Sequence, residues 1–573
     1  TITLVAVFFP IVFMDGMTGR LFREFSIVVS GSVIISSFAA LTFTPMLATK
    51  LLIKREKQSW FYRKTEPFFE GMNRIYSRSL AAFLRKRWIA LPFTAATILI
   101  IGFLWNYIPA EMAPLEDRSQ ISINTRGAEG VTYEYIRDYT EDINLLVDSI
   151  TPDAEAVTAR VSSGSGNIRI TLKDMQDRDY TQMEVAEKLS KAVQKKTMAR
   201  SFVQQSSSFG GRRGGMPVQY VLQATNIEKL QEVLPKFMAK VYENPVFQMA
   251  DVDLKFSKPE ARININRDKA SIMGVSTRNI AQTLQYGLSG QRMGYFYMNG
   301  KQYEILGEIN RQQRNKPADL KGIYIRSSQG DMVQLDNLIE LTDGIAPPKL
   351  YRYNRFVSAT ISAGLADGKT IGQGLDEMDK IAKETLDDTF RTALTGDSKE
   401  YRESSSSLMF AFILAILLIY LILAAQFESF KDPLIIMLTV PLAIAGALVF
   451  MYFGDITMNI FSQIGIIMLI GLVAKNGILI VEFANQKQET GEDKMQAIKD
   501  AALQRLRPIL MTSASTVLGL IPLAFATGEG CNQRIAMGTA VVGGMLVSTL
   551  LTMYIVPAIY SYVSTNRSKL KNE

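Results

Sequence analysis

A lysine lies deep inside a long apolar stretch, where an ionisable side chain can take part in moving charge. Lys475 stands in the run Ile460–Phe483, whose 24 residues are enough to cross a bilayer as a helix. It lies eight residues before the end of that run, roughly 12 Å inside the apolar zone at about 1.5 Å per residue. An ammonium group at that depth costs on the order of 2.5–3.5 kcal/mol, so we expect it to face other helices and a counter-charge. Two interpretations stay open: a helix-packing lysine with a local partner, or a member of an ion or proton relay.

The next apolar segment begins with two arginines and carries several hydroxyl groups. Arg505 and Arg507 are predicted to anchor its cytoplasmic end. Pro508 is typical of the first turn of a helix, so we expect the helix to begin there. A run of hydroxyl residues follows from Thr512 to Thr516. This run either holds helices together by hydrogen bonds or forms a proton path beside the lysine.

Composition narrows the class of protein. The chain has 573 residues, which exceeds the size of one ordinary domain. It is 47% hydrophobic and has a net charge of +8. The basic residues gather next to apolar runs, which indicates anchoring at a membrane face rather than nucleic-acid binding. With no His and a single Cys, Cys531, the sequence excludes His-based catalysis, an internal disulfide and a multi-Cys metal site. No nucleophile–base set or phosphate-binding loop is present, so we expect neither an enzyme nor a metal site.

Apolar runs of membrane length predict seven full spans and one partial span. Residues 1–53 hold the partial span and one full span, residues 54–87 an amphipathic helix at the cytoplasmic interface, and residues 88–108 the next span. Residues 403–573 hold the other five spans and a basic tail. The basic loops fall on one side of the membrane, which the positive-inside rule assigns to the cytoplasm. Residues 109–402 are therefore expected outside, in the periplasm of a cell with two membranes.

The segment between the spans has the pattern of a mixed α/β fold. Residues 109–216 show strands and helices in the order of a ferredoxin-like, split β-α-β unit. The same order opens in residues 217–257 and resumes in residues 346–402. Residues 258–345 are then an insertion between the two halves of this second unit. The sequence thus predicts two related subdomains and a third that interrupts one of them.

Shorter patterns locate strands, turns and a loop within this segment. Asn299-Gly300 is a strong signal for a β-hairpin, and Ser328–Gly330 indicates another. Val252–Phe256 alternates as the second strand of the second unit. Residues 206–215 are rich in Ser, Gly and Arg and are predicted to form a mobile loop or a plain linker.

The two ends of the chain repeat each other. Phe8–Ala48 falls on Leu520–Tyr560 after a shift of 512 positions without gaps. The matched positions include two prolines and two glycines that frame the same span–turn–span pattern: Pro10 with Pro522, Gly16 with Gly528, Gly31 with Gly543 and Pro45 with Pro557. A repeat of this length predicts a whole protein about twice as long, with a counterpart of the Lys475 helix upstream of Thr1. Internal repeats with a site at their interface are a recurrent plan of transporters.

Several stretches together carry a resemblance to a known family. The most specific are Phe9–Gly19, Leu41–Leu47, Pro109–Asp117, Gly471–Phe483 and Arg505–Ser513. They resemble the resistance–nodulation–division efflux family, in particular the hydrophobe/amphiphile pumps of Gram-negative inner membranes. The resemblance covers essentially the whole chain.

The resemblance implies a fold and partners. The fold is a membrane α-helical bundle with seven full spans plus one partial, and a large periplasmic α/β insert of ferredoxin-like porter subdomains and a docking subdomain. The spans would be helices five, in part, to twelve of the pump, and residues 258–345 the docking subdomain. Members of the family are homotrimers that work with a periplasmic adaptor protein and an outer-membrane channel. No cofactor is implied beyond the proton gradient.

The resemblance also assigns roles to residues. Lys475, Arg505 and Thr512 are similar to the proton-relay lysine, arginine and threonine of the family. Their acidic partners, a pair of aspartates on the fourth helix, are absent from this chain. The implied activity is secondary active transport, an antiport of protons against hydrophobic or amphiphilic small molecules.

The sequence departs from the family at the expected substrate pocket. Drug pumps of this family carry a Phe- and Gly-rich loop in the first porter unit, whereas the hairpin Arg160–Asn167 is short and has no aromatic residue. Phe202 and Phe209 are the residues we expect to line a substrate pocket, with packing in the core or loop as the alternative. Two other functions stay open: export of heavy-metal cations, which needs a ladder of Met residues through the insert, and a non-transporting membrane scaffold.

Overall fold

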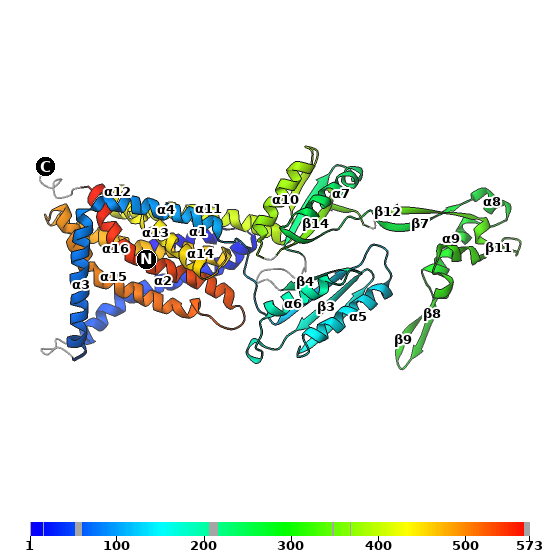
Figure 1. Ribbon diagram of the computed structural model, residues 1–573, viewed down its shortest axis with the longest axis horizontal. Coiled ribbons are helices and arrows are strands. Elements are labelled where there is room, and N and C mark those ends of the chain that lie inside the picture. Colours follow the sequence, from blue (N-terminus) through cyan, green and yellow to red (C-terminus); the bar gives the residue numbers. More distant parts are fainter. Residues whose placement is uncertain are drawn as a thin grey trace. The chain divides into compact units, whose positions relative to one another are not determined.

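The structure is a computed structural model of the chain (Figure 1). It describes residues 2–14, 16–51, 60–205, 216–346, 349–366 and 368–565. The chain divides into two compact units, each with a hydrophobic core of its own. The first consists of Thr1–Arg126, Ile136–Asp253 and Arg352–Glu573, and the second of Gly127–Tyr135 and Leu254–Tyr351.

The apolar runs form helices. Within the described residues, seven helical segments are long and apolar enough to cross a membrane, and Ile2–Val12 is a shorter apolar helix, which confirms the predicted seven full spans and one partial span. The helices are α1 (Ile2–Val12), α2 (Gly16–Leu51), α3 (Trp60–Arg85), α4 (Ala90–Tyr107), α11 (Gly396–Phe427), α12 (Lys431–Met437), α13 (Thr439–Phe453), α14 (Ile460–Glu489), α15 (Lys494–Ala524) and α16 (Cys531–Val563). The amphipathic helix α3 is the one predicted at the interface.

Glycines allow the central helices α13, α14 and α16 to pack closely. A Cβ atom on Gly446 would lie 2.6 Å from the Cβ of Val547, and one on Gly544 would lie 2.8 Å from the carbonyl oxygen of Ala443. Neither position has space for a side chain. Small residues at such contacts let helix backbones approach each other, and the closer van der Waals packing helps to hold helices together where lipid replaces water.

The prediction that a helix begins at Pro508 is wrong. Helix α15 begins at Lys494, and Pro508 stands inside it. Asp493 caps the helix by accepting a hydrogen bond from the backbone N–H of Met495 at 3.1 Å. The segment before the proline is rich in helix-forming residues and buries one apolar side, so the helix continues beyond the apolar run. Hydropathy alone located the membrane-length part of the helix and missed its polar first half.

The two ends that repeat in sequence also repeat in backbone geometry. Gly16, the first residue of α2, has φ +83°, and Gly528, in the turn between α15 and α16, has φ +88°. Residues other than glycine rarely adopt this region. The matched prolines Pro45 and Pro557 both lie inside the helix that follows. The two segments therefore share the backbone conformation of the matched glycines as well as their order of helices.

The first α/β subdomain has six elements and one four-stranded sheet. They are β1 (Gln120–Arg126), α5 (Tyr133–Ile150), β2 (Ala156–Ser162), β3 (Ser165–Thr171), α6 (Gln182–Gln194) and β4 (Arg200–Gln205). The antiparallel strand order β2-β3-β1-β4 is that of a split β-α-β unit. Helices α5 and α6 pack on one face of the sheet, where alternate strand residues such as Ile121, Ile123 and Ile168 form the core (Figure 1).

The second α/β subdomain has a sheet with the same order at its centre. Its elements are β5 (Val218–Ala224), α7 (Ile227–Glu243), β6 (Phe247–Val252), β13 (Tyr351–Tyr353), β14 (Phe356–Leu365), α10 (Ile371–Thr385) and β15 (Arg391–Leu394). Strands β6, β14, β5 and β15 lie side by side. The prediction of a strand at Val252–Phe256 is wrong, because the chain enters β6 soon after α7 ends. This earlier start buries Phe247 and Ala250 and pairs Ala250 with Ala363 of β14.

The second unit is smaller and rich in hairpins. Its elements are β7 (Lys258–Ile265), α8 (Arg267–Ile272), α9 (Thr277–Leu288), β8 (Gln291–Met298), β9 (Lys301–Gly307), β10 (Tyr324–Arg326), β11 (Met332–Gln334) and β12 (Ile339–Ala346). Asn299 and Gly300 have φ of 52° and 73° and join β8 to β9, which confirms the predicted hairpin. The hairpin predicted at Ser328–Gly330 is also present, between β10 and β11.

Candidate functional site

One face of helix α14 is more open than the others. Lys475 is exposed, and Met468, Leu472, Leu479 and Glu482 are partly exposed. Because these positions are three or four residues apart, they form one stripe along the helix. Lys475 has neither an ion pair nor a hydrogen bond within the part of the chain that the structure describes. The structure thus has the ammonium group on an open, mostly apolar face, and its counter-charge stays a prediction.

Next to Lys475 in the sequence, Asn476 belongs to a group of three buried polar side chains that joins three helices. The Nδ2 atom of Asn476 on α14 donates to the Oγ atom of Ser513 on α15 at 3.3 Å and to the Oγ1 atom of Thr549 on α16 at 3.4 Å. The Ser513 and Thr549 hydroxyl groups lie 3.0 Å apart. We call these three residues the polar triad. Sequence reasoning did not single out Asn476 or Thr549, although an amide beside Lys475 in an apolar run was a signal.

The other two residues of the predicted relay make different contacts. Thr512 donates to the carbonyl oxygen of Ile509 at 3.1 Å within its own helix. The guanidinium group of Arg505 lies over the ring of Phe483 at 4.4 Å, and its Nε atom is buried without a hydrogen-bond partner in the described chain. No ion pair or hydrogen bond joins Lys475, Arg505 and Thr512 there. The polar triad brings together the residues that directly follow Lys475 and Thr512.

The linker from α4 to β1 is tied to the loop that precedes α14. Its residue Ala110 forms a parallel bridge with Met458. The N–H of Met458 donates to the carbonyl oxygen of Pro109 at 2.8 Å, and the N–H of Glu111 donates to the carbonyl oxygen of Met458 at 3.0 Å. The two backbone hydrogen bonds of Met458 therefore fix the linker to the loop that leads into α14, the helix that carries Lys475.

Glu111 makes the stability of the contact between the linker and the loop before α14 depend on pH. Burial raises the pKa of its carboxyl group above 4.5, although a hydrogen bond from the hydroxyl of Thr457 opposes the shift. A raised pKa means that the folded protein binds the proton more tightly. Glu111 therefore contributes stability that is fully present below pH 4.5 and is lost as the pH rises through the raised value.

Replacing Glu111 by glutamine is expected to remove the loss of stability that accompanies rising pH. The thermal midpoint of the purified protein should fall less between pH 4 and pH 7 in Glu111→Gln than in the wild type. Thr457→Val, which removes the opposing hydrogen bond, should move the loss to higher pH. Equal pH profiles for the wild type and Glu111→Gln would contradict the assignment.

Further along, the linker is tied to the N-terminal end of α16. The side-chain amide of Asn532 donates to the carbonyl oxygen of Leu115 at 2.7 Å. The backbone N–H of Gln533 donates to a carboxylate oxygen of Glu116 at 3.0 Å. A carboxylate at the N-terminal end of a helix is stabilised by the helix dipole. The linker thus contacts α16, whose middle carries a member of the polar triad.

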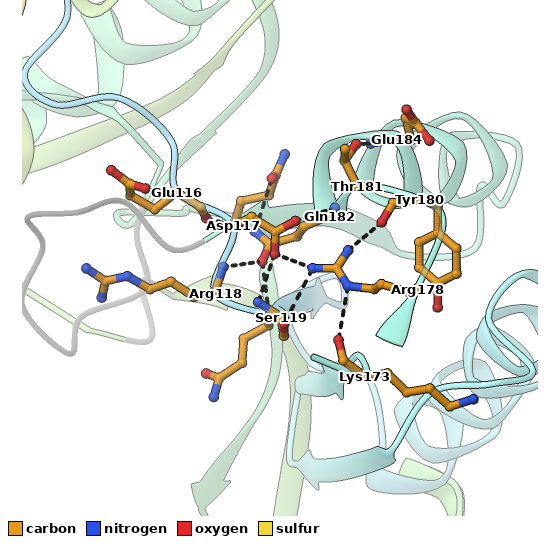
Figure 2. Close-up of polar contacts among 12 residues, drawn as sticks. Glu116, Asp117, Arg118, Ser119, Lys173, Arg178, Tyr180, Thr181, Gln182 and Glu184 are labelled. Carbon is orange, nitrogen blue, oxygen red and sulfur yellow. Dashed lines mark hydrogen bonds and ion pairs between the residues drawn. The ribbon is translucent and has the colours of Figure 1, made fainter. Parts of the chain in front are cut away.

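The last part of the linker is held by the first α/β subdomain (Figure 2). Arg178, whose side chain is fully buried, forms an ion pair with Asp117 and donates to the carbonyl oxygens of Lys173 at 3.0 Å and Tyr180 at 2.8 Å. The second carboxylate oxygen of Asp117 accepts from the N–H of Gln182 at 2.9 Å. We call Asp117, Arg178 and Gln182 the linker clamp.

Gln182 completes the clamp from the start of α6. Its Oε1 atom accepts from the backbone N–H groups of Arg118 and Gln120, both at 3.0 Å (Figure 2). Its Nε2 atom donates to the carbonyl oxygen of Glu116 at 3.3 Å. A buried polar group with several partners fixes the backbone that it binds. The clamp therefore fixes the linker to the sheet at the residue where β1 begins.

A hollow of about 330 Å³ lies on the sheet of the first α/β subdomain. Phe202, one of the two predicted pocket residues, lines it together with polar residues of β1, β2 and β3. The other, Phe209, lies outside the described residues, as does the predicted loop of residues 206–215. The volume is within the range of pockets for small molecules. This hollow is the second candidate site.

Sequence comparison identifies the family of the chain. The model of one protein family, the AcrB/AcrD/AcrF family, matches residues 1–564. The chain belongs to the AcrB/AcrD/AcrF family. It is also 31% identical over 582 aligned residues to a protein of Haemophilus influenzae described as an uncharacterized transporter. All of this chain and 56% of that relative are covered, so the chain spans about half the length of the relative. The resemblance to the resistance–nodulation–division family is thereby confirmed, and the chain is a multi-pass membrane protein of that family.

Proposed function

We propose that this chain is part of an exporter in the inner membrane of a Gram-negative bacterium. The exporter uses proton entry to move hydrophobic or amphiphilic small molecules out of the periplasm and the membrane. Family membership supports this proposal, and one feature of the structure carries it: Lys475 on the open stripe of α14. An ammonium group among membrane helices requires an acidic partner, and the open stripe leaves space for a helix that provides one.

The contacts provide a route from the lysine to the α/β subdomain. Protonation of the partner carboxylate would remove its attraction for Lys475 and change the preferred position of α14. The polar triad would move α15 and α16 with it. The linker, held by Met458 before α14 and clamped at Asp117, would carry the shift to β1. Proton entry drives such a cycle only if the two protonation states prefer different packings.

The proposal includes the partners of the complete exporter. We propose a homotrimer that works with a periplasmic adaptor protein and an outer-membrane channel, as members of its family do. Residues 109–216 would be the first porter subdomain, residues 217–257 and 346–402 the second, and residues 258–345 the docking subdomain.

The test uses the complete protein in liposomes that contain a pH-sensitive dye. A pH gradient is imposed, and transport of the neutral amphiphile N-phenyl-1-naphthylamine is followed together with the internal pH. We expect transport that a protonophore stops, and proton movement that rises when the amphiphile is added. Transport that is unchanged by the protonophore would contradict the proposal.

A further inference from the structure

The sheet of the first α/β subdomain has one face covered by helices and one polar face. Ile121 and Ile123 of β1 and Ile168 and Ile170 of β3 point toward α5 and α6. Because successive residues of a strand point to opposite faces, the residues between these isoleucines point the other way. Asn124, which follows Ile123 in β1, points the same way as these residues and lines the hollow.

The strand register arranges the polar face in rows. Residues that face each other across neighbouring strands form a line perpendicular to the strands. The first row contains Arg160, Asn167, Asn124 and Phe202, taken from β2, β3, β1 and β4. The second row contains Ser162, Ser165, Arg126 and Arg200 in the same strand order. The hollow of about 330 Å³ lies over these two rows.

Positive charge is in excess on this face. Arg126 and Arg200 share one carboxylate, that of Asp251, at 3.1 Å and 3.4 Å. Arg160 is exposed and has no ion pair within the part of the chain described. Among the described residues, the three arginines of these two rows thus have one acidic partner, Asp251, which pairs with two of them. Guanidinium groups bind carboxylates, sulfonates and phosphates through paired, charge-assisted hydrogen bonds.

Amide groups form the floor between the charged and the aromatic ends of the first row. The Nδ2 atom of Asn167 donates to the Oδ1 atom of Asn124 at 2.8 Å, and the Nδ2 atom of Asn124 donates to the Oε1 atom of Gln204 at 3.0 Å. This chain of hydrogen bonds fixes the amides in place. Arg160 and Phe202 are three strand spacings apart, which is roughly 14 Å between their backbones at about 4.8 Å per step.

We propose that this hollow selects amphiphiles that carry an anionic group. The anionic group lies against Arg160, with Arg126 on the neighbouring row adding positive charge, and an aromatic or apolar body lies against Phe202. Among the described residues of the lining Phe202 is the one aromatic side chain, so a neutral ring system is expected to bind more weakly than an amphiphile whose anionic group also pairs with Arg160. This inference rests on the proposed export function and names the substrate class for it.

Two fluorescent probes that differ by one sulfonate group test the preference. 8-Anilino-1-naphthalenesulfonate is anionic, and N-phenyl-1-naphthylamine is its neutral counterpart. Binding of each is measured by equilibrium dialysis to the complete protein in lipid nanodiscs, without a gradient, with empty nanodiscs subtracted. In Arg160→Gln we expect the Kd of the anionic probe to rise on the order of tenfold, the loss of one hydrogen-bonded charge. The Kd of the neutral probe should stay the same.

Arg169→Gln is the matched control. Arg169 is exposed on the same face of the same sheet but does not line the hollow. Its replacement should leave the Kd of both probes unchanged. Equal losses in the two variants, or an equal loss of both probes in Arg160→Gln, would overturn the proposed preference. Because binding needs no gradient, failure of proton-driven transport with the binding preference intact would contradict only the proposed function.

Discussion

Replacing Lys475 by alanine in the complete protein is expected to reduce proton-driven export by a factor on the order of 100 or more. The variant would leave the proposed acidic partner without its counter-charge, and removing one member of a buried pair costs about 3–5 kcal/mol. The partner would then stay protonated, and the cycle would lose the difference between its two states. The measurement is the initial rate of amphiphile transport in liposomes under a fixed pH gradient.

Two variants control for loss of the lysine side chain as such. Lys475→Arg keeps the positive charge and should retain part of the transport rate. Lys50→Ala removes a lysine from an exposed position in the last turn of α2 and should have no effect. Transport near the wild-type rate in Lys475→Ala would exclude the lysine from the relay.

Replacing Arg178 by methionine is expected to lower the stability of the first α/β subdomain by about 3–5 kcal/mol. The side chain of Arg178 is fully buried and that of Asp117 is 14% exposed, so the carboxylate would stay behind without its partner. The carbonyl oxygens of Lys173 and Tyr180 would also lose their donor. Chemical unfolding of the purified protein, followed by a probe in this subdomain, measures the change.

A double variant separates the ion pair from the rest of the packing. Asp117→Asn in the Arg178→Met background removes the unpaired charge and should recover a large part of the lost stability. Arg137→Met is the control, because Arg137 and its neighbour Asp138 form an exposed ion pair that is worth little. A loss in Arg178→Met no larger than in Arg137→Met would contradict the role of the linker clamp.

Patterns of hydropathy and of turn residues were sufficient for most of the fold. The spans, the Asn299-Gly300 hairpin and the order of strands in the α/β segment follow from local periodicity, which is set by helix and strand geometry. The start of α15 at Lys494 was missed because its first half is amphipathic and lies outside the apolar run. The start of β6 at Phe247 was missed because pairing with β14, and not local alternation, selects which residues are in the strand.

The candidate sites were less predictable, since they depend on contacts between distant segments. Lys475 stood out because a charge in an apolar run is conspicuous in any sequence. Asn476 and Thr549 become a pair only when α14 and α16 pack together, over a separation of 73 residues. The excess charge near Arg160 required the register of four strands. No local pattern contains such information.

The most direct test of the relay is the distance from the Nζ atom of Lys475 to the nearest carboxylate oxygen in an experimental structure of the complete protein. The proposal predicts a distance of at most about 4 Å, the limit for an ion pair, to an acidic residue on a neighbouring membrane helix. An Nζ atom that faces lipid or open water, with no carboxylate on any helix beside the open stripe of α14, would contradict it.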